Sequence, residues 1–286
     1  MDGLFLIDQP RSGVQNMAVD DTMLEHAARQ GEVMLRVYRW EVPTLSLGYF
    51  QRIQERETHG PSLTLPCVRR ATGGGAIVHH YDWTYAVALP QSILTERVGA
   101  SQQLYHAVHE AVTEWLATMG IAAATVGEGS PRPVPSSATA SSGHQVGGDV
   151  REPAALSPTA RHQPAKQNGC GCPFLCFERR NPGDVVAAGW KLMGSAQRRR
   201  GGAVLQHGSL LVRQSCYAPS LPGLWEQLGS GGFESWFGAL GSQLTEAVMR
   251  GVQRLAPINW RPMLHALPPS PAAVKQYAAP AWTQRR

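Results

Sequence analysis

One cysteine of this sequence, Cys176, is a candidate nucleophile. Cys176 follows Cys170 and Cys172 within the segment Cys-Gly-Cys-Pro-Phe-Leu-Cys-Phe. Its thiolate could attack a carbonyl carbon and form a thioester intermediate. A metal site made by all three cysteines is a second interpretation, but Cys-x-Cys-x3-Cys is not the usual spacing of paired zinc ligands, and we predict no metal. A buried, unreactive cysteine is the third interpretation.

A lysine between large apolar residues is the second candidate. Lys191 lies between Trp190 and Leu192 in a predicted hairpin, so its ammonium is expected to be partly desolvated. Such a cation could stabilise negative charge that develops on an acyl carbonyl or a phosphate. The alternative is a surface lysine whose stem packs along an edge strand. The small residues that follow would let a ligand approach the main chain closely, namely Gly194, Ser195 and Ala196.

Two arginines precede three consecutive glycines in the stretch Arg69-Arg70-Ala71-Thr72-Gly73-Gly74-Gly75-Ala76-Ile77-Val78-His79. Consecutive glycines weaken a strand, but they suit a place where main chain approaches a ligand or where amides face an anion. The arginines would supply positive charge for a carboxylate or a phosphate. A tight turn with surface arginines is the alternative. The stretch is not a P-loop, because no Gly-Lys-Ser/Thr follows at the required spacing.

Three predicted helices would support these residues. Apolar positions recur at helical spacing in residues 14–30, 101–119 and 234–255. Asn16 is expected to cap the start of the first helix, and Gly31 is expected to end it.

Short runs of β-branched and aromatic residues predict strands over residues 34–40, 44–50, 67–70 and 203–212. We expect residues 76–79 and 83–89 to form a strand pair after the Gly-rich turn. Residues 184–193 are expected to form a hairpin that turns at Ala188-Gly189, with Gly194 to Gln197 directly after it. Strands and helices do not alternate regularly, so the predicted fold class is α+β, with a mixed or antiparallel sheet cradled by helices.

An insertion at about 127–169 interrupts this pattern. It contains no Phe, Trp, Tyr, Ile or Met and is rich in Ser, Pro, Ala and Gly. Such a segment buries too little apolar surface to offset the entropy of ordering, so we predict that it is disordered. Because neither flank forms a complete fold alone, we predict a single domain over residues 1–286.

Composition limits the location and the partners. The formal net charge is +5 at pH 7, which favours acidic partners such as nucleic acid or an acidic carrier protein. The five cysteines are odd in number and three are crowded, unlike a secreted disulfide framework. No apolar run approaches the roughly 20 residues that cross a bilayer, and the N-terminus lacks the pattern of a signal peptide. We therefore expect a cytoplasmic protein without a membrane partner.

Taken together, the motifs resemble those of the biotin/lipoate protein ligase catalytic family, and within it the branch of lipoate ligase A and LipM-type octanoyltransferases. The Arg69 to His79 stretch resembles the family's central signature. Lys191 matches the family's lysine within Gly-Trp-Lys-Leu-Met-Gly-Ser-Ala-Gln, residues 189–197. Further matches are residues 16–20, 35–48, 206–210 and 275–282. The resemblance implies a sheet that cradles an acyl chain, in a pocket lined by Arg70, Gly73, Gly74, Gly75, Ala76, His79, Gly194, Ser195, Ala196, His207 and Gly208.

Two mechanisms occur in this family. A lipoate ligase uses ATP and Mg²⁺ to make lipoyl-adenylate, whereas an octanoyltransferase moves octanoate from acyl carrier protein onto a cysteine without ATP. The position of Cys176 before the lysine hairpin, the stretch Trp-Thr-Tyr-Ala-Val at residues 83–87 and the lack of room for an accessory domain after Trp282 favour the transferase. Gly75 favours the ligase, because transferases of this type often carry arginine there. His80 replaces the acidic residue expected after His79.

The resemblance thus predicts an octanoyl-[acyl-carrier-protein]:protein N-octanoyltransferase. Cys176 would carry the acyl thioester, Lys191 and nearby amides would stabilise the oxyanion, and a neutral His79 or His207 would take the thiol proton. The expected partners are octanoyl-acyl carrier protein and either lipoyl domains of 2-oxoacid dehydrogenases or the glycine cleavage H protein. No cofactor and no nucleic acid are expected. An ATP-dependent lipoate-protein ligase and a non-catalytic acyl-binding member remain as alternatives.

Overall fold

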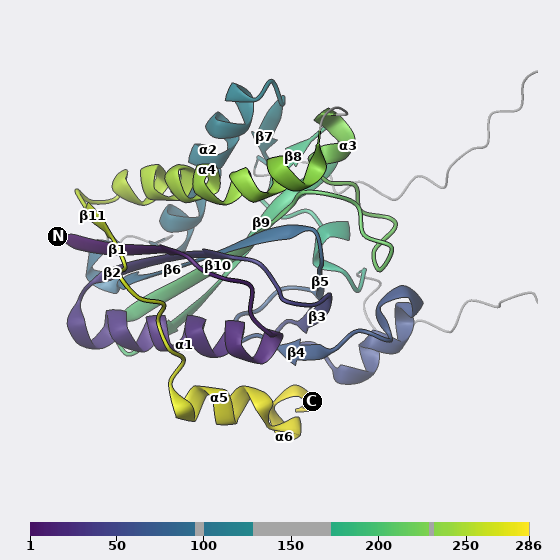
Figure 1. Cartoon of the computed structure of the whole chain (residues 1–286), viewed down its shortest axis with the longest axis horizontal. Coiled ribbons are helices and arrows are strands. Elements are labelled where there is room, and N and C mark those ends of the chain that lie inside the picture. Colours follow the sequence, from purple (N-terminus) through teal and green to yellow (C-terminus); the bar gives the residue numbers. More distant parts are fainter. Residues whose placement is uncertain (95–99, 128–172, 229–231, 286) are drawn as a thin grey trace, which may run out of the picture.

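A mixed sheet of eight strands forms the centre of the computed structural model, which describes residues 1–94, 100–127, 173–228 and 232–285 (Figure 1). Its strand order is β11-β1-β2-β6-β10-β9-β8-β7. The pairs β11–β1 and β1–β2 are parallel, and all later pairs are antiparallel. The strands are β1 (Asp2–Ile7), β2 (Val33–Tyr38), β6 (Asp82–Pro90), β7 (Ala123–Thr125), β8 (Val185–Ala187), β9 (Trp190–Arg200), β10 (Ala203–Leu211) and β11 (Asn259–Pro262).

A smaller sheet lies at one end of the long central strands (Figure 1). Its order is β4-β3-β5, from β3 (Thr44–Leu47), β4 (Cys67–Arg69) and β5 (Ile77–His79). The predicted pairing of residues 76–79 with 83–89 is therefore wrong. β5 pairs with β3, whereas β6 pairs with β2 and β10. Only His80 and Tyr81 separate β5 from β6, so the chain passes from one sheet to the other within two residues.

Helices cover both faces of the large sheet (Figure 1). α2 (Ala100–Thr118) and α4 (Phe233–Gln253) pack on one face, where Leu35, Tyr85 and Val87 of the sheet belong to a continuous apolar core. α1 (Gly13–Gln30) packs on the other face, with α5 (Pro271–Ala278) beyond it. The short helices are α3 (Trp225–Leu228), α6 (Pro280–Thr283), η1 (Ile53–Thr58), η2 (Gly60–Ser62), η3 (Gln91–Ile93) and η4 (Cys176–Glu178). The predicted α+β class is confirmed.

The start of α1 differs from the prediction. Ser12, not Asn16, is the N-cap, and it forms a capping box with Gln15. Asn16 lies one turn inside the helix, where its side chain donates to the carbonyl oxygens of Arg11 and Arg39. The predicted end is confirmed, because Gly31 adopts a left-handed conformation with φ 69°.

The hairpin that carries Lys191 forms as predicted, with positive φ at Ala188 and Gly189. Its second strand is longer than expected, because β10 pairs with β9 along its length as far as Arg200. Gly194 to Gln197 therefore lie within β9 and not after it. The strand predicted over residues 44–50 is shorter, since Gly48 begins a turn closed by the amide of Gln51.

Strands β1 and β11 and helix α5 had no counterpart among the predicted elements. The predicted disordered insertion lies outside the described residues except for Gly127, and so do Cys170 and Cys172. Within the ranges that the structure describes, no helix is long and apolar enough to cross a membrane.

Candidate functional site

A cavity with about 520 Å³ of empty space brings the predicted residues together. It lies where α1, the large sheet, the Gly-rich loop and the segment around Cys176 meet. Every predicted site residue lines it except Gly75 and Ala76.

Cys176 and Lys191 meet in this cavity. The Lys191 ammonium nitrogen Nζ lies 3.8 Å from the Cys176 sulfur. It also forms an ion pair of 2.7 Å with the Asp184 carboxylate, and both of these side chains are about 1% exposed. The alternative of a surface lysine is therefore wrong. Cys176 itself is partly exposed, in contrast to an enclosed core cysteine.

Asp184 is a site residue that the sequence motifs did not indicate. Besides the ion pair with Lys191, it accepts hydrogen bonds from the Tyr105 hydroxyl at 2.6 Å and from the main-chain amide of Asn181 at 2.7 Å. Burial and the neighbouring carboxylate raise the pKa of Tyr105, so its hydroxyl stays a donor. The carboxylate is thus held from three directions, and it fixes the ammonium beside the sulfur.

Close packing explains Gly75, and backbone conformation explains Gly74. A methyl group on Gly75 would lie 3.0 Å from both the main-chain nitrogen and the Cα of Cys176. The amide of Cys176 donates to the carbonyl of Ala76 at 2.7 Å, and the amide of Ala76 donates to Phe174 at 3.1 Å. Gly74 has φ 93°, which favours glycine, and its added Cβ would lie 3.9 Å from the Cys176 sulfur. Gly75 and Ala76 therefore support the cysteine from outside the cavity.

Glycines in the sheet make room for the polar side chains. A Cβ on Gly194 would lie 2.7 Å from Nζ of Lys191. A Cβ on Gly208 would overlap the Ser195 hydroxyl oxygen and would lie 2.7 Å from the Tyr85 ring. A side chain at either position would displace polar groups that line the cavity.

Of the two arginines before the glycines, only Arg70 lines the cavity. Its guanidinium donates to the Ser46 hydroxyl and carbonyl and to the carbonyls of Gly73 and Gly75, at 2.7 to 3.1 Å. Its Nε is buried without a hydrogen-bond partner among the described residues. Burial lowers the pKa of Arg70 to about 10. Arg69 instead binds main-chain carbonyls, including those of Gln51 and Thr283, and has a structural role.

His79 is buried between two partners. Its Nδ1 lies 2.8 Å from the Asp82 carboxylate and its Nε2 lies 2.7 Å from the Ser46 hydroxyl. Because the carboxylate only accepts, Nδ1 donates and Nε2 accepts the Ser46 proton. Burial lowers the pKa of His79, which Asp82 partly opposes. The acidic partner is thus Asp82, in place of the acidic residue missing at position 80.

His207 has the same kind of arrangement. Its Nδ1 lies 3.2 Å from Asp20, and its Nε2 lies 2.5 Å from the Thr72 hydroxyl. Both ring nitrogens of His79 and of His207 are therefore engaged elsewhere, and in this arrangement neither imidazole has a nitrogen free for the Cys176 thiol. One of these two histidines was expected to take the thiol proton. In the structure, neither imidazole contacts the Cys176 sulfur through a free nitrogen.

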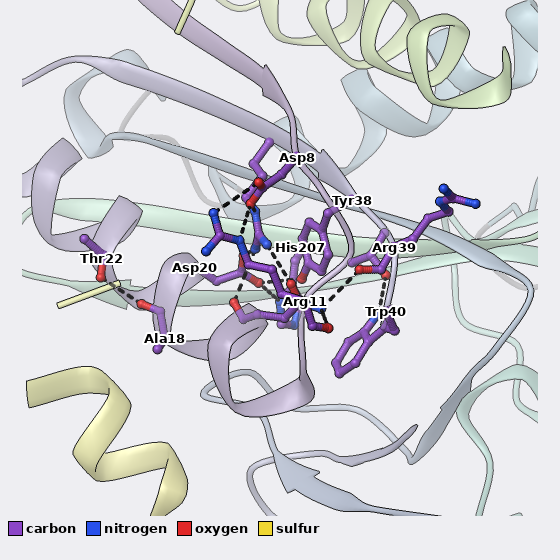
Figure 2. A network of polar contacts seen from close by, with 12 residues as sticks. Asp8, Arg11, Ala18, Asp20, Thr22, Tyr38, Arg39, Trp40 and His207 are labelled. Carbon is purple, nitrogen blue, oxygen red and sulfur yellow. Dashed lines mark hydrogen bonds and ion pairs between the residues drawn. The ribbon is translucent and has the colours of Figure 1, made fainter. Parts of the chain in front are cut away.

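Asp20 connects the cavity to a buried network of charges (Figure 2). It accepts from the Tyr38 hydroxyl at 2.8 Å and from Arg36 at 3.1 Å. Arg36 also donates to Asp8 at 2.8 Å, and Asp8 in turn binds Arg11. Tyr38 and His207 both line the cavity, so this network fixes the wall next to α1.

A third buried imidazole was not anticipated. His109 of α2 donates from Nδ1 to the Gly183 carbonyl at 2.7 Å, so its Nε2 accepts from the Ser195 hydroxyl at 2.6 Å. Tyr85 donates to the same hydroxyl oxygen at 2.7 Å. Burial lowers the pKa of His109 to about 3. In sequence it is only a histidine on the apolar face of a helix, which gives no signal of contact with Ser195.

Potential metal ligands do not cluster in the part of the chain that the structure describes: no group of three or more His, Cys, Asp or Glu could hold a metal ion there. A site that used Cys170 or Cys172 lies outside those residues.

Curated proteins with similar sequences include two octanoyltransferases. The chain is 30% identical over 206 residues to the octanoyltransferase LipM of Carboxydothermus hydrogenoformans, covering 71% of this chain and 62% of that protein. It is 32% identical over 205 residues to the octanoyltransferase LipM of Kyrpidia tusciae, covering 70% of this chain and 62% of that protein. The matched region thus spans less than two thirds of these relatives.

Solved structures show the same fold. Protein Ta0514 of T. acidophilum with bound lipoic acid matches with a TM-score of 0.63 at 18% identity, covering 99% of this chain and all of that one. A lipoate-protein ligase A bound with ATP matches with a TM-score of 0.62 at 18% identity and 99% coverage of each chain. The family model described as the lipoyl protein ligase A/B catalytic domain matches residues 12–218, and the chain belongs to that family.

Proposed function

We propose that this protein is an octanoyltransferase that moves an octanoyl group from acyl carrier protein to a lysine of a lipoyl domain, through a thioester on Cys176. The observation that carries the proposal is the 3.8 Å approach of the Lys191 ammonium to the Cys176 sulfur inside the cavity. A fixed ammonium at this distance can stabilise the negative charge that develops when the cysteine attacks a carbonyl carbon. The relatives named octanoyltransferase support the same reaction.

In the first half of the reaction, the Cys176 sulfur attacks the carbonyl carbon of the octanoyl thioester. The carbon–sulfur bond to the carrier breaks, and the carrier thiolate leaves and takes up a proton. In the second half, a neutral acceptor lysine attacks the Cys176 thioester. An amide forms, the amine loses a proton, and the Cys176 thiol is regenerated.

Lys191 has an electrostatic role in both halves. Each tetrahedral intermediate carries negative charge on the former carbonyl oxygen, and a fixed ammonium stabilises that charge. Asp184 holds the ammonium in place through a 2.7 Å ion pair. The main-chain amides of Gly74 and Gly75 donate no hydrogen bond within the described residues and lie beside the cysteine, so they are candidate donors to the same oxygen.

The ATP-dependent lipoate ligase is less well supported by the residues of the cavity. Asp184 is the one carboxylate among the described residues that line it, and Lys191, Tyr105 and Asn181 already engage that carboxylate. A Mg²⁺ ion with ATP would have to compete for it. Gly75, which favoured the ligase in the sequence, is explained by the main chain of Cys176 packed against it.

The test combines octanoyl-acyl carrier protein with the full chain and measures intact mass. We expect an added octanoyl group on the wild type and none on Cys176→Ser. We then expect transfer to a lipoyl domain or to the H protein without ATP. Transfer that needs ATP and persists in Cys176→Ser would instead support the ligase. Absence of any acylation with or without ATP would support a non-catalytic acyl-binding protein.

A further inference from the structure

Aromatic and cationic side chains, exposed or partly exposed, form a surface beside the cavity. They are Tyr49, Phe50, Arg198 and Arg285, which we call the aromatic-arginine surface. We propose that an acidic acceptor domain docks on this surface to present its lysine to the Cys176 thioester. The inference rests on the proposed function, because it gives a location to the second substrate of that reaction.

The side chains of this surface hold one another in place. The Phe50 ring packs edge-on against Tyr49 with centroids 5.0 Å apart, and Phe50 is 66% exposed. The guanidinium carbons of Arg198 and Arg285 lie 5.2 and 4.3 Å from the Tyr49 ring centroid. Arg285 also hydrogen-bonds to the Tyr49 hydroxyl. A preformed surface of this kind loses little side-chain entropy on binding.

The surface continues directly into the cavity. An added Cβ at Gly73, which lines the cavity, would lie 3.8 Å from the Phe50 ring. The next residue is Gly74, whose added Cβ would lie 3.9 Å from the Cys176 sulfur. From the other side, Ala196 lines the cavity and Arg198 follows two residues later on the same face of β9. A partner bound here would lie at the edge of the cavity that contains the Cys176 sulfur.

The charges of this surface are available to a partner. Arg200 is neutralised by Asp21 and Glu25 of α1. By contrast, among the described residues neither Arg198 nor Arg285 takes part in an ion pair with an acidic side chain. Exposed aromatic residues and arginine are typical of the centres of protein interfaces. The positive charge of Arg198 and Arg285 selects an acidic partner and accelerates its approach.

The position of the surface at the edge of the cavity favours the acceptor over the donor. A lysine has only a four-carbon stem, so its domain must lie against the mouth of the cavity when the amine attacks. An acyl carrier protein presents its thioester on a much longer arm and does not need contacts so close to Cys176. The partner is therefore an acidic domain that exposes a lysine on its surface.

The test measures binding and chemistry separately. Binding of an unacylated lipoyl domain to the full chain is measured by calorimetry, for the wild type, Arg198→Glu and Phe50→Ser. Arg250→Glu on α4 is the matched control, since Arg250 is half-exposed and lies on the helix layer across the sheet. We expect each surface variant to weaken binding about tenfold and added salt to weaken wild-type binding. The control is expected to bind like the wild type.

In the second measurement, octanoyl-N-acetylcysteamine loads Cys176 without a carrier protein, and hydroxylamine serves as a small acceptor. The surface variants are expected to load and to react with hydroxylamine at wild-type rates, but to transfer to the lipoyl domain about tenfold more slowly. Wild-type affinity in both surface variants, or equal weakening in Arg250→Glu, would overturn the docking surface. Binding that depends on the surface, without any acyl-Cys176, would instead overturn the proposed function and leave the docking surface standing.

Discussion

Two groups of buried charges border the cavity, and they differ in what lies beside their cation. In the group next to α1, Arg36 donates to Asp8, Asp20 and Asn16, and Asp20 also receives Tyr38 and His207. In the group at the hairpin, Lys191 is shared between the Asp184 carboxylate and the Cys176 sulfur. The first group has all its charges balanced by fixed neighbours. The second keeps a cation beside a partly exposed nucleophile.

This difference separates stability from reactivity. A buried network in which every member has partners fixes the wall that contains Tyr38 and His207. A cation beside a thiol that faces the cavity can stabilise negative charge that develops on a ligand. We therefore expect substitutions in the first group to change mainly the free energy of unfolding, and substitutions in the second to change mainly the rate of acylation.

The largest expected effect is on stability. Arg36→Met leaves the carboxylates of Asp8 and Asp20 buried without their shared cation, and removal of one partner from a buried ion pair costs about 3–5 kcal/mol. Urea denaturation measures the free energy of unfolding. Arg11→Met, which removes a less buried partner of Asp8, is the control and should cost less. Equal losses in both variants would contradict the comparison.

The next effect is on rate. Lys191→Met removes the ammonium beside Cys176, and the loss of one such charge stabiliser slows a reaction by about 100- to 1000-fold. Acylation of Cys176 is followed by intact mass. The double variant Lys191→Met/Asp184→Asn leaves no unpaired buried carboxylate. The same slow rate in this double variant would show that the loss of rate does not come from misfolding. Exposed Lys275→Met should react normally, and a wild-type rate in Lys191→Met would remove the ammonium from the mechanism.

A pH effect on stability is expected from His109. Its pKa is lowered to about 3 in the folded protein by burial, against about 6.5 when unfolded. The unfolded chain therefore binds the proton first, so the contribution is complete above pH 6.5 and is lost as the pH falls toward 3. Between pH 6.5 and 5 the loss is on the order of 2 kcal/mol. His109→Gln, which can still bind both Ser195 and Gly183, should have a shallower pH dependence; an unchanged slope would contradict the assignment.

The smallest expected effect comes from Gly75→Ala. The new methyl group would lie 3.0 Å from the main chain of Cys176 and would displace the sulfur from Lys191. A shift of the nucleophile should slow acylation by about tenfold, since rates depend on such positioning. Gly60→Ala, where a Cβ has open space, is the control. If the two variants acylate equally fast, Gly75 does not position the cysteine.

Much of the site is predictable because its residues belong to local patterns. Cys176, Lys191 and the Gly-rich stretch stand out in the sequence, and the structure brings them into one cavity. The capping box of Ser12 and Gln15 is also visible in the sequence, although Asn16 in the same segment is an equally good capping residue by type. The small residues from Gly194 suggest a loop, yet they lie in a strand, because pairing with β10 outweighs their weak strand preference.

The residues that were missed depend on contacts that form only when the chain folds, some of them between distant segments. Asp184 becomes a site residue through its ion pair with Lys191, with Tyr105 of α2 holding the carboxylate, and His109 becomes one through Ser195 of β9. The pairing of His79 with Asp82 arises because the chain changes sheets between β5 and β6. No pattern of hydrophobicity or spacing encodes such contacts, so only the folded arrangement reveals them.

The contact between α6 and Arg69 bears on how the protein is made. The Arg69 guanidinium binds the Thr283 carbonyl, and the Trp282 indole donates to the Arg69 carbonyl at 2.9 Å. The neighbouring residue is Arg70 of the cavity. During synthesis the Gly-rich loop thus receives this support only once residues 282 and 283 have emerged from the ribosome. A nascent chain stalled before α6 should bind an octanoyl ligand more weakly than one that has passed it, so that the pocket is completed only after a segment 213 residues beyond Arg69 has been made.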